Sequence, residues 1–314
     1  EYGRVLVTGA PVFLFSAFLQ AFVRNDRAPK VSMAAVVAGG VTNVILDYIF
    51  IFPMKMGMAG AAVASVIGSL LTVGILLTHF FSPESTLKTV ARPNWRKAWE
   101  VVTAGFASFL LEMCNGVVTF LFNRQLLVYV GDLGVVVYGI ISNSALIVAS
   151  ISNGISQAVQ PILATNYGAG RKERLKETRH LGEMAVTVSG VLFTGIGLLL
   201  PALVTAAFVK PTAEILAMSV PAVRIYFLSF FAMGFNILYS TYFQSVMKPG
   251  YSLFICMMRG MVLNAVLVFL LPIAFGVTGI WSVMPVTEFL TLFVCRFLLT
   301  AQNKKLPSNG PAAV

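Results

Sequence analysis

An aspartate lies inside a long apolar stretch near the start of the chain. The stretch VSMAAVVAGGVTNVILDYIFIF, residues 31–52, has Asp47 as its only side chain that is charged at neutral pH. As a helix it is long enough to cross a bilayer core of roughly 30 Å. A charge at that depth commonly marks an ion or substrate path. Asn43 precedes Asp47 by one helical turn, so the carboxylate and the amide oxygen can converge on one proton or one Na⁺. A polar pair that holds two helices together is the alternative.

Two further carboxylates lie deep in apolar stretches. Glu112 lies in GFASFLLEMCNGVVTFLFNRQ, residues 105–125, and Asn115 follows at i+3, where it can share a set of cation ligands. Glu288 follows Pro285, whose missing N–H frees a backbone carbonyl nearby. We interpret both carboxylates as candidate ion or proton coupling residues. For Glu288, a structural contact between helices explains the residue equally well.

A third polar group consists of amides rather than acids. Gln157, Gln160 and Pro161 form a polar, interrupted stretch in a span, which suggests gating or substrate contact, although packing between helices is equally compatible. The chain has no spaced Cys/His set typical of a metal centre. We therefore expect no catalytic residue, no cofactor, and no metal beyond a possible Na⁺ at Asp47/Asn43 or at Glu112.

The elements that position these residues are predicted to be membrane-spanning helices. The 314 residues are 58% hydrophobic and only 11% charged, far from the roughly 25% charged residues of soluble domains. Apolar runs long enough to span recur nine times, at 5–22, 31–52, 59–81, 99–123, 135–165, 182–208, 217–243, 251–275 and 278–300. The prediction is an all-α polytopic membrane protein.

The net charge of +10 has a topological explanation. Most lysines and arginines fall on alternate loops, which the positive-inside rule makes cytoplasmic. This distribution predicts a cytoplasmic C-terminus and does not indicate nucleic-acid binding. The residues assigned to that side are Arg24, Arg27, Lys30, Lys88, Arg92, Arg96, Lys97, Arg171, Lys172, Arg174, Lys176, Arg179, Lys248, Arg259, Arg296, Lys304 and Lys305.

An internal repeat relates the first spans to the last ones. Arg4 to Pro29 and Arg224 to Pro249 have the same spacing, and at that offset Asn43 falls one residue from the place of Asn264. GMAGAA at 57–62 then matches GVTGIW at 276–281. Residues 1–81 thus resemble residues 221–300 with parallel topology, as in transporters with repeats related by an axis along the membrane normal.

The repeat predicts a domain organisation. We expect residues 1–81 to be the second half of an N-lobe with three helices, 82–98 a cytoplasmic linker, 99–300 a C-lobe with six helices, and 301–314 a cytoplasmic tail. The three spans that precede the later copy have no counterpart before residue 1. The interpretation is a fragment of a six-plus-six protein in which two pseudo-symmetric bundles are joined by the linker.

Several motifs together resemble one transporter family. RNDRAPKVSM (24–33), NVILDYIFIF (43–52), MGMAGAAVAS (56–65) and GISQAVQPILATNYGAGRKERLKE (154–177) are similar to the multidrug and toxic compound extrusion (MATE) transporters. The resemblance runs from residue 1 to about residue 300. It implies twelve helices in two lobes, of which this chain would hold helices four to twelve. It also implies export of cationic, amphipathic compounds coupled to inward Na⁺ or H⁺ flow.

The resemblance assigns roles to particular residues. Asn43 and Asp47 match the coupling network of the family's N-lobe, and Glu112 matches an acidic residue that some branches carry for cation or substrate binding. The stretch FLSFFAMGFNILYSTYF, residues 227–243, has Asn236 where another branch carries an aspartate. That departure argues against a Na⁺ site formed by the C-lobe alone and leaves Asn236, like Asn115, Gln157 and Gln160, as a candidate for substrate contact or gating.

The functional prediction is a secondary active antiporter rather than an enzyme. We expect a monomer in the plasma membrane whose partners are the lipid bilayer and a small cationic or amphipathic substrate. A lipid-linked saccharide flippase of the same superfamily is the alternative, although it should favour cationic residues in its cavity. A membrane-embedded transferase is more remote, because it would need paired acidic motifs for Mg²⁺ at a membrane face.

Overall fold

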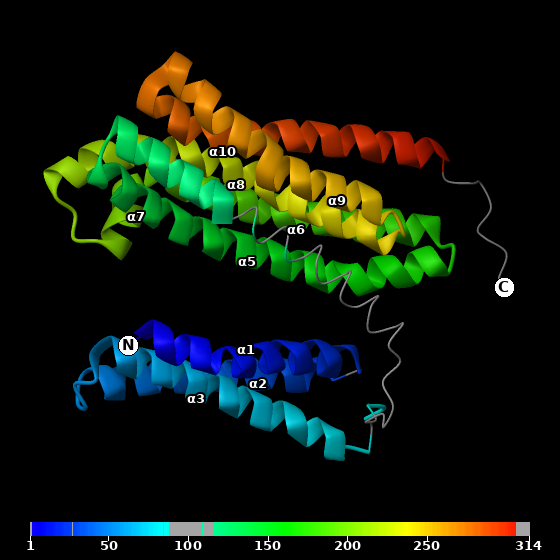
Figure 1. The fold of residues 1–314 in the computed structure, drawn as a ribbon. Helices are drawn as coiled ribbons and strands as arrows, with labels where there is room; N and C mark the ends of the chain where they lie inside the picture. Colours follow the sequence, from blue (N-terminus) through cyan, green and yellow to red (C-terminus); the bar gives the residue numbers. More distant parts are fainter. Residues whose placement is uncertain are drawn as a thin grey trace. The chain divides into compact units, whose positions relative to one another are not determined.

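The computed structural model describes residues 2–26, 28–83, 85–87, 109, 113 and 116–305. The chain divides into two compact units, Glu1–Ala98 and Trp99–Val314. In both units the described secondary structure is helical, and long helices lie side by side within each bundle (Figure 1). The chain is therefore an all-α protein.

The first unit is here called the N-unit, and its described residues form three long helices and one short 3₁₀ turn. Pro29 begins its helix at a position where a missing N–H costs nothing. Gly57 begins another with φ +57, a conformation that suits glycine. The elements are α1 (Tyr2–Asn25), α2 (Pro29–Ile51), α3 (Gly57–Thr78) and η1 (His79–Phe81).

Small residues bring α2 and α3 close together. A Cβ placed on Gly39 would lie 2.6 Å from the carbonyl oxygen of Gly68, so only glycine fits at this crossing. Next to it, the Thr72 hydroxyl donates a hydrogen bond of 3.3 Å to the carbonyl of Ala35. Asn43 lies one turn further along α2 and packs against Gly68. The glycine crossing thus places the Asn43 side chain beside α3.

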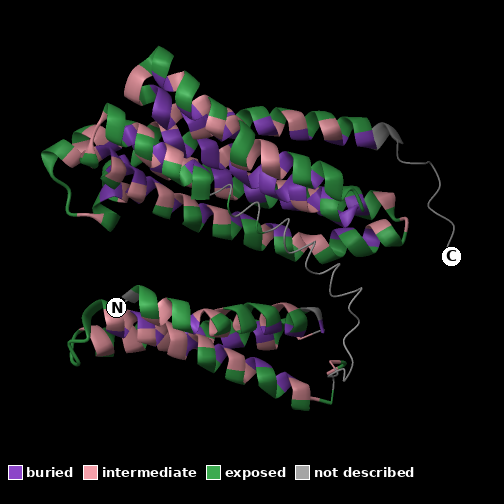
Figure 2. Cartoon of the chain, in the orientation of Figure 1, coloured by how far each residue is buried: buried purple, intermediate pink, exposed green. Residues whose placement is uncertain are grey.

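The second unit, the C-unit, is built around one central helix. Figure 2 shows buried residues running along α8, which packs against α5, α6 and α10. Glycines permit the closest approach, since a Cβ on Gly190 of α6 would lie 3.0 Å from Cα of Phe231. Residues 116–129 are also helical. The other elements are α5 (Asp132–Gly168), α6 (Lys172–Leu199), α7 (Pro201–Phe208), α8 (Ala213–Ser245), α9 (Pro249–Met257), η2 (Met258–Val262, a π-helix) and α10 (Leu263–Lys305).

Of the nine predicted spans, 251–275 and 278–300 lie in one kinked helical segment, and most of 99–123 lies outside the described residues. Three other details differ from the prediction. Seven helices of the described residues are long and apolar enough to cross a membrane, and the last of these, Pro249–Gln302, changes direction at Gly276. The span predicted at 182–208 is wrong as one helix, because Pro201 begins a new one after Leu200. The interruption predicted at Pro161 is also wrong, since α5 continues through it. The π-helix inside 251–275 was not predicted.

The internal repeat is visible in the backbone. Gly57 and Gly276 both have φ +57, and each precedes or begins the third helix of its copy. Three residues later, a Cβ on Gly60 would lie 2.8 Å from Cβ of Phe50, and a Cβ on Gly279 would collide with the backbone of Leu271. Both copies therefore turn into their third helix in the same way and pack that helix on the end of the second.

Candidate functional site

The predicted pair in α2 has its asparagine bonded to the neighbouring helix. Asn43 Nδ2 donates a hydrogen bond of 3.2 Å to the Ser65 hydroxyl on α3, and that hydroxyl donates 3.0 Å to the carbonyl of Ala61. Asp47 is half-buried, and its Oδ1 is buried without a hydrogen-bond partner among the residues that the structure describes. Asn43 is thus fixed toward α3, while Asp47 has an oxygen available.

An unpartnered carboxylate oxygen at membrane depth can bind a proton or a hard cation. A buried polar atom without a partner costs free energy, and binding a proton or Na⁺ would remove that cost. Oxygen ligands are also those that such cations prefer. The geometry near Asp47 is therefore compatible with ion or proton coupling, and Ser65 is a neighbouring polar residue that the sequence analysis missed.

Glu288 is in a different environment. Its side chain is fully buried, and Oε1 accepts a hydrogen bond of 2.6 Å from Nε of Arg259. Asn236, also fully buried, donates from Nδ2 to Oε2 of Glu288 at 2.7 Å and to its backbone carbonyl at 2.8 Å. The structure therefore unites Glu288 and Asn236, two predicted site residues, around an ion pair (Arg259–Glu288) that the sequence analysis did not foresee.

The assignment of Arg259 to a cytoplasmic loop is wrong. Arg259 lies in η2, ten residues after the start of α9 at Pro249, which is about 15 Å along the helix. The positive-inside pattern misled the interpretation because it counts basic residues along the sequence without regard to pairing. A basic residue inside an apolar run, together with Glu288 inside the next run, was the available signal.

The π-helix places two polar residues on the same side of their helix. Asn264 follows Arg259 by five residues, which is the spacing of one π turn. Its Nδ2 donates a hydrogen bond of 2.8 Å to the backbone carbonyl of Arg259. Oδ1 of Asn264 accepts a hydrogen bond of 3.0 Å from the hydroxyl of Thr287 in α10, the residue before Glu288. One continuous polar network, the C-unit network, therefore consists of Asn236, Arg259, Asn264, Thr287 and Glu288.

The remaining predicted residues lie elsewhere. Gln157 is exposed and Gln160 half-buried on α5. Glu112 and Asn115 lie outside the described residues. Their assignments to coupling and to substrate contact or gating therefore stay predictions.

A second buried carboxylate of the N-unit lies at the other end of its helices. The carboxylate of Asp26, which follows α1, accepts a hydrogen bond from the Thr86 hydroxyl. Its Oδ2 also lies 2.8 Å from His79 Nε2, 3.0 Å from the backbone nitrogen of Thr86 and 3.3 Å from the Ser85 hydroxyl. The hydrogen bond from the Thr86 hydroxyl, followed by that from His79, lowers the pKa of Asp26 from 3.8 to about 2, against the opposing effect of burial. Asp26 is therefore a charged cap that ties residues 85–86 to the N-unit.

Comparison with known proteins identifies the family. The MatE family profile matches residues 104–270, which is more than half of the chain. The chain belongs to the MATE family. Two similar curated proteins are both named Multidrug export protein MepA. The one from Staphylococcus aureus (strain NCTC 8325 / PS 47) is 25% identical, over 98% of this chain and 69% of its own length. The one from Staphylococcus saprophyticus is 25% identical, over 97% of this chain and 69% of its own length.

Solved MATE structures have the same fold. An outward-facing multidrug resistance MATE transporter of the MOP superfamily gives a TM-score of 0.84 at 21% identity, over 97% of this chain and 70% of that one. A MOP superfamily transporter from Pyrococcus furiosus, described as having reverse polarity of its binding pocket, gives a TM-score of 0.87 at 19% identity. The match covers 98% of this chain and 70% of that one. The chain is therefore a multi-pass membrane protein with the pseudo-symmetric helical bundles of MATE transporters.

Proposed function

We propose that this MATE protein is a secondary active antiporter that exports cationic, amphipathic compounds in exchange for Na⁺ or H⁺. Its relatives are named multidrug export proteins, which supports a small drug-like substrate and a transport role without enzymatic chemistry. The observation that carries the proposal is the buried, unpartnered Oδ1 of Asp47 in α2.

The proposed mechanism is competition at this carboxylate. An ion or proton that arrives from outside neutralises Asp47 and weakens its attraction for a cationic substrate, and the protein then returns to its inward-facing state. Asn43 and Ser65 fix the adjacent part of α2 against α3, so that Asp47 remains in place. Coupling requires that each ligand bind the two states with different affinity.

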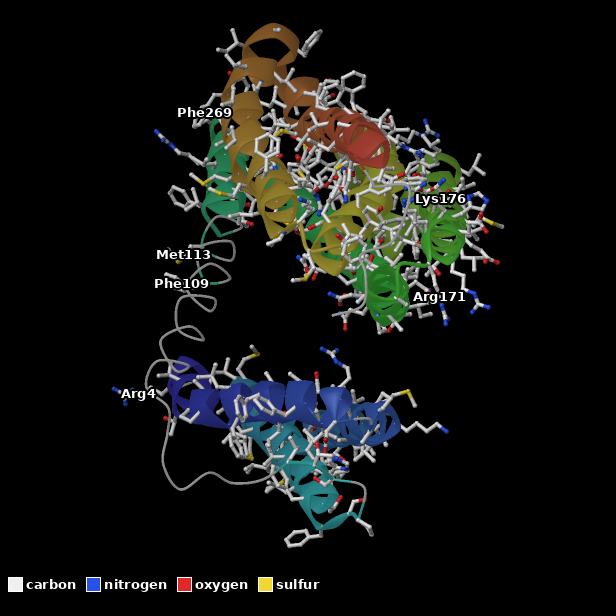
Figure 3. All side chains as sticks on the ribbon, turned by 90° about the vertical axis from the view of Figure 1, so that its right-hand side faces the viewer. Arg4, Phe109, Met113, Arg171, Lys176 and Phe269 are labelled. Atoms are coloured by element: carbon white, nitrogen blue, oxygen red, sulfur yellow. The ribbon has the colours of Figure 1, made fainter. Side chains whose placement is uncertain are left out.

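The proposal includes an orientation in the plasma membrane with a cytoplasmic C-terminus. The turn between α5 and α6 is strongly basic, and Figure 3 shows Arg171 and Lys176 projecting from that end of the C-unit. Basic residues flanking a span favour the cytoplasmic side. Reassigning Arg259 to the interior leaves this support intact. We also propose that the protein acts as a monomer.

The test is ethidium efflux from cells that express the protein, with the Na⁺ and H⁺ gradients collapsed separately. Loss of efflux when one gradient is removed would support antiport and identify the coupling ion. Efflux that persists without either gradient would contradict the proposal. If no efflux occurs although the protein is present in the membrane, export of lipid-linked saccharides becomes the function to test.

A further inference from the structure

We propose that Arg259 is a binding site for the carboxylate of an amphiphile that also carries a positive charge, with Glu288 as a fixed counter-ion. The inference rests on the proposed transport function but concerns a different group from Asp47. It assigns a ligand chemistry to the C-unit network that goes beyond cationic substrates. The observation behind it is the unequal exposure of the two members of the ion pair.

Arg259 is accessible although it faces inward. The buried face of its helix includes Ile255, four residues before Arg259, and Asn264, five residues after it across the π turn. The Arg259 side chain is nevertheless 23% exposed, whereas that of Glu288 is 0% exposed. Part of the Arg259 side chain therefore lies at the surface of the C-unit, whereas the Glu288 side chain lies behind it. The accessible charge of this buried pair is positive.

The arginine has donors to spare. A guanidinium has five N–H donors in a rigid fork, and the contact with Glu288 uses Nε. No hydrogen bond from its terminal nitrogens to another described residue is seen. The fork matches a carboxylate with two parallel hydrogen bonds, which an ammonium group cannot do. An arginine held on one edge by Glu288 can thus receive a second carboxylate on another edge.

The surrounding contacts fix this geometry before a ligand arrives. Asn236 holds Glu288 through both its carboxylate and its backbone carbonyl, and Asn264 holds the Arg259 carbonyl. Such preorganisation reduces the ordering cost of binding. Because the ion pair is already neutral, a simple anion would introduce an unbalanced charge at low dielectric. A ligand with both a carboxylate and a cationic centre avoids that cost, which is why we specify a zwitterion.

The experiment compares two dyes that differ only at the carboxylate. Tetramethylrhodamine carries a free carboxylate beside its cationic ring system, and tetramethylrhodamine ethyl ester does not. Their affinities for the purified protein in lipid nanodiscs are measured by fluorescence anisotropy, with no ion gradient. We expect the acid to bind at least about tenfold more tightly than the ester, which corresponds to one well-formed charged hydrogen-bond pair.

Two variants test the assignment to Arg259. Arg259→Gln combined with Glu288→Gln removes the pair without changing net charge and should abolish the preference for the acid. Arg224→Gln removes one exposed arginine of α8 elsewhere in the C-unit and should leave the preference unchanged. If the double variant does not fold, Arg259→Lys replaces it, and the acid preference should then fall several-fold because the fork is lost.

Three results would overturn the inference. They are equal binding of acid and ester to the parent protein, absence of saturable binding of either dye, and an acid preference that survives in the folded double variant or in Arg259→Lys. Since binding is measured without a gradient, loss of ion-coupled efflux would refute the proposed antiport while leaving this result unaffected.

Discussion

Each copy of the repeat has an asparagine at a corresponding position, Asn43 in α2 and Asn264 in α10. The carboxylates near these two asparagines have opposite surroundings. In the N-unit, Asn43 binds Ser65 and leaves Asp47 with an oxygen that has no partner among the described residues. In the C-unit, Asn264 belongs to a network in which both oxygens of Glu288 accept hydrogen bonds. One backbone arrangement thus supports a carboxylate available to a cation and another already compensated by arginine.

The largest expected difference is between the variants that remove the negative charge of Asp47 and of Glu288. Asp47→Asn should lower ethidium efflux by about tenfold or more, as expected for an ordinary coupling free energy. It should not lower the melting temperature, since it removes a poorly satisfied charge. Glu288→Gln should lower the melting temperature, because Arg259 loses its counter-ion. Efflux assays and thermal unfolding in detergent measure both effects.

Asp132→Asn is the matched control for that comparison. Asp132 is an exposed carboxylate at the start of α5, so the same chemical change should alter neither efflux nor melting temperature substantially. Parental efflux in folded Asp47→Asn would remove the functional distinction between the two repeats.

The second prediction tests whether Arg259 and Glu288 act as a pair. Arg259→Leu alone leaves a fully buried carboxylate without its ion partner and should cost about 3–5 kcal/mol of stability. Adding Glu288→Leu should restore most of that loss. Equilibrium unfolding of the two single variants and the double variant gives the coupling free energy. Additive effects would show that the two residues do not depend on each other.

A smaller effect is expected at the glycine crossing that positions Asn43. Gly39→Ala introduces a methyl group where the Gly68 carbonyl and the Thr72 side chain already lie, and overpacking of this kind costs about 1–3 kcal/mol. Gly40→Ala, one residue later, enters open space and serves as the control. Melting temperature and ethidium efflux should fall for Gly39→Ala only. Equal values for both variants would mean that the crossing does not determine the position of Asn43.

The smallest effect separates the two acids of the N-unit, Asp47 and Asp26. The folded-state pKa of Asp26 is depressed from 3.8 to about 2, so its stabilisation is present above pH 3.8 and is lost as the pH falls toward 2. Asp26→Asn should therefore lower the melting temperature at neutral pH, where the parent carboxylate is charged. The difference from the parent should shrink as the solution is acidified. A difference that grows on acidification would contradict the assigned sign.

Much of the fold could be predicted because apolar length and repeated motifs determine it. The long apolar runs and the matching glycines of 57–62 and 276–281 indicate the helices and the repeat directly. The break at Leu200 and the continuity of α5 through Pro161 depend on local hydrogen bonding and helix packing, which composition does not report. Prolines in membrane helices therefore do not by themselves locate helix ends.

The candidate sites were predictable by residue type but not by partner. Depth in an apolar run singled out Asp47 and Glu288, and their assignment to ion or proton coupling stays a prediction. The direction of Asn43 toward Ser65, and the pairing of Arg259 with Glu288, arise from the rotation of neighbouring helices, which a single sequence does not specify. Arg259 was missed because the positive-inside rule counts basic residues along the sequence without regard to a buried partner.

The π-helix at Met258–Val262 also explains a discrepancy in the spacing of the repeat. Arg4 and Arg224 are 220 positions apart, as are Pro29 and Pro249, whereas Asn43 and Asn264 are 221 apart. The extra residue enters between Pro249 and Asn264, where η2 lies. A π turn accommodates a one-residue insertion within a helix without moving the helix ends out of register. As far as Asn264, the later copy thus carries one inserted residue relative to the earlier copy, and that insertion allows Arg259 and Asn264 to share one face.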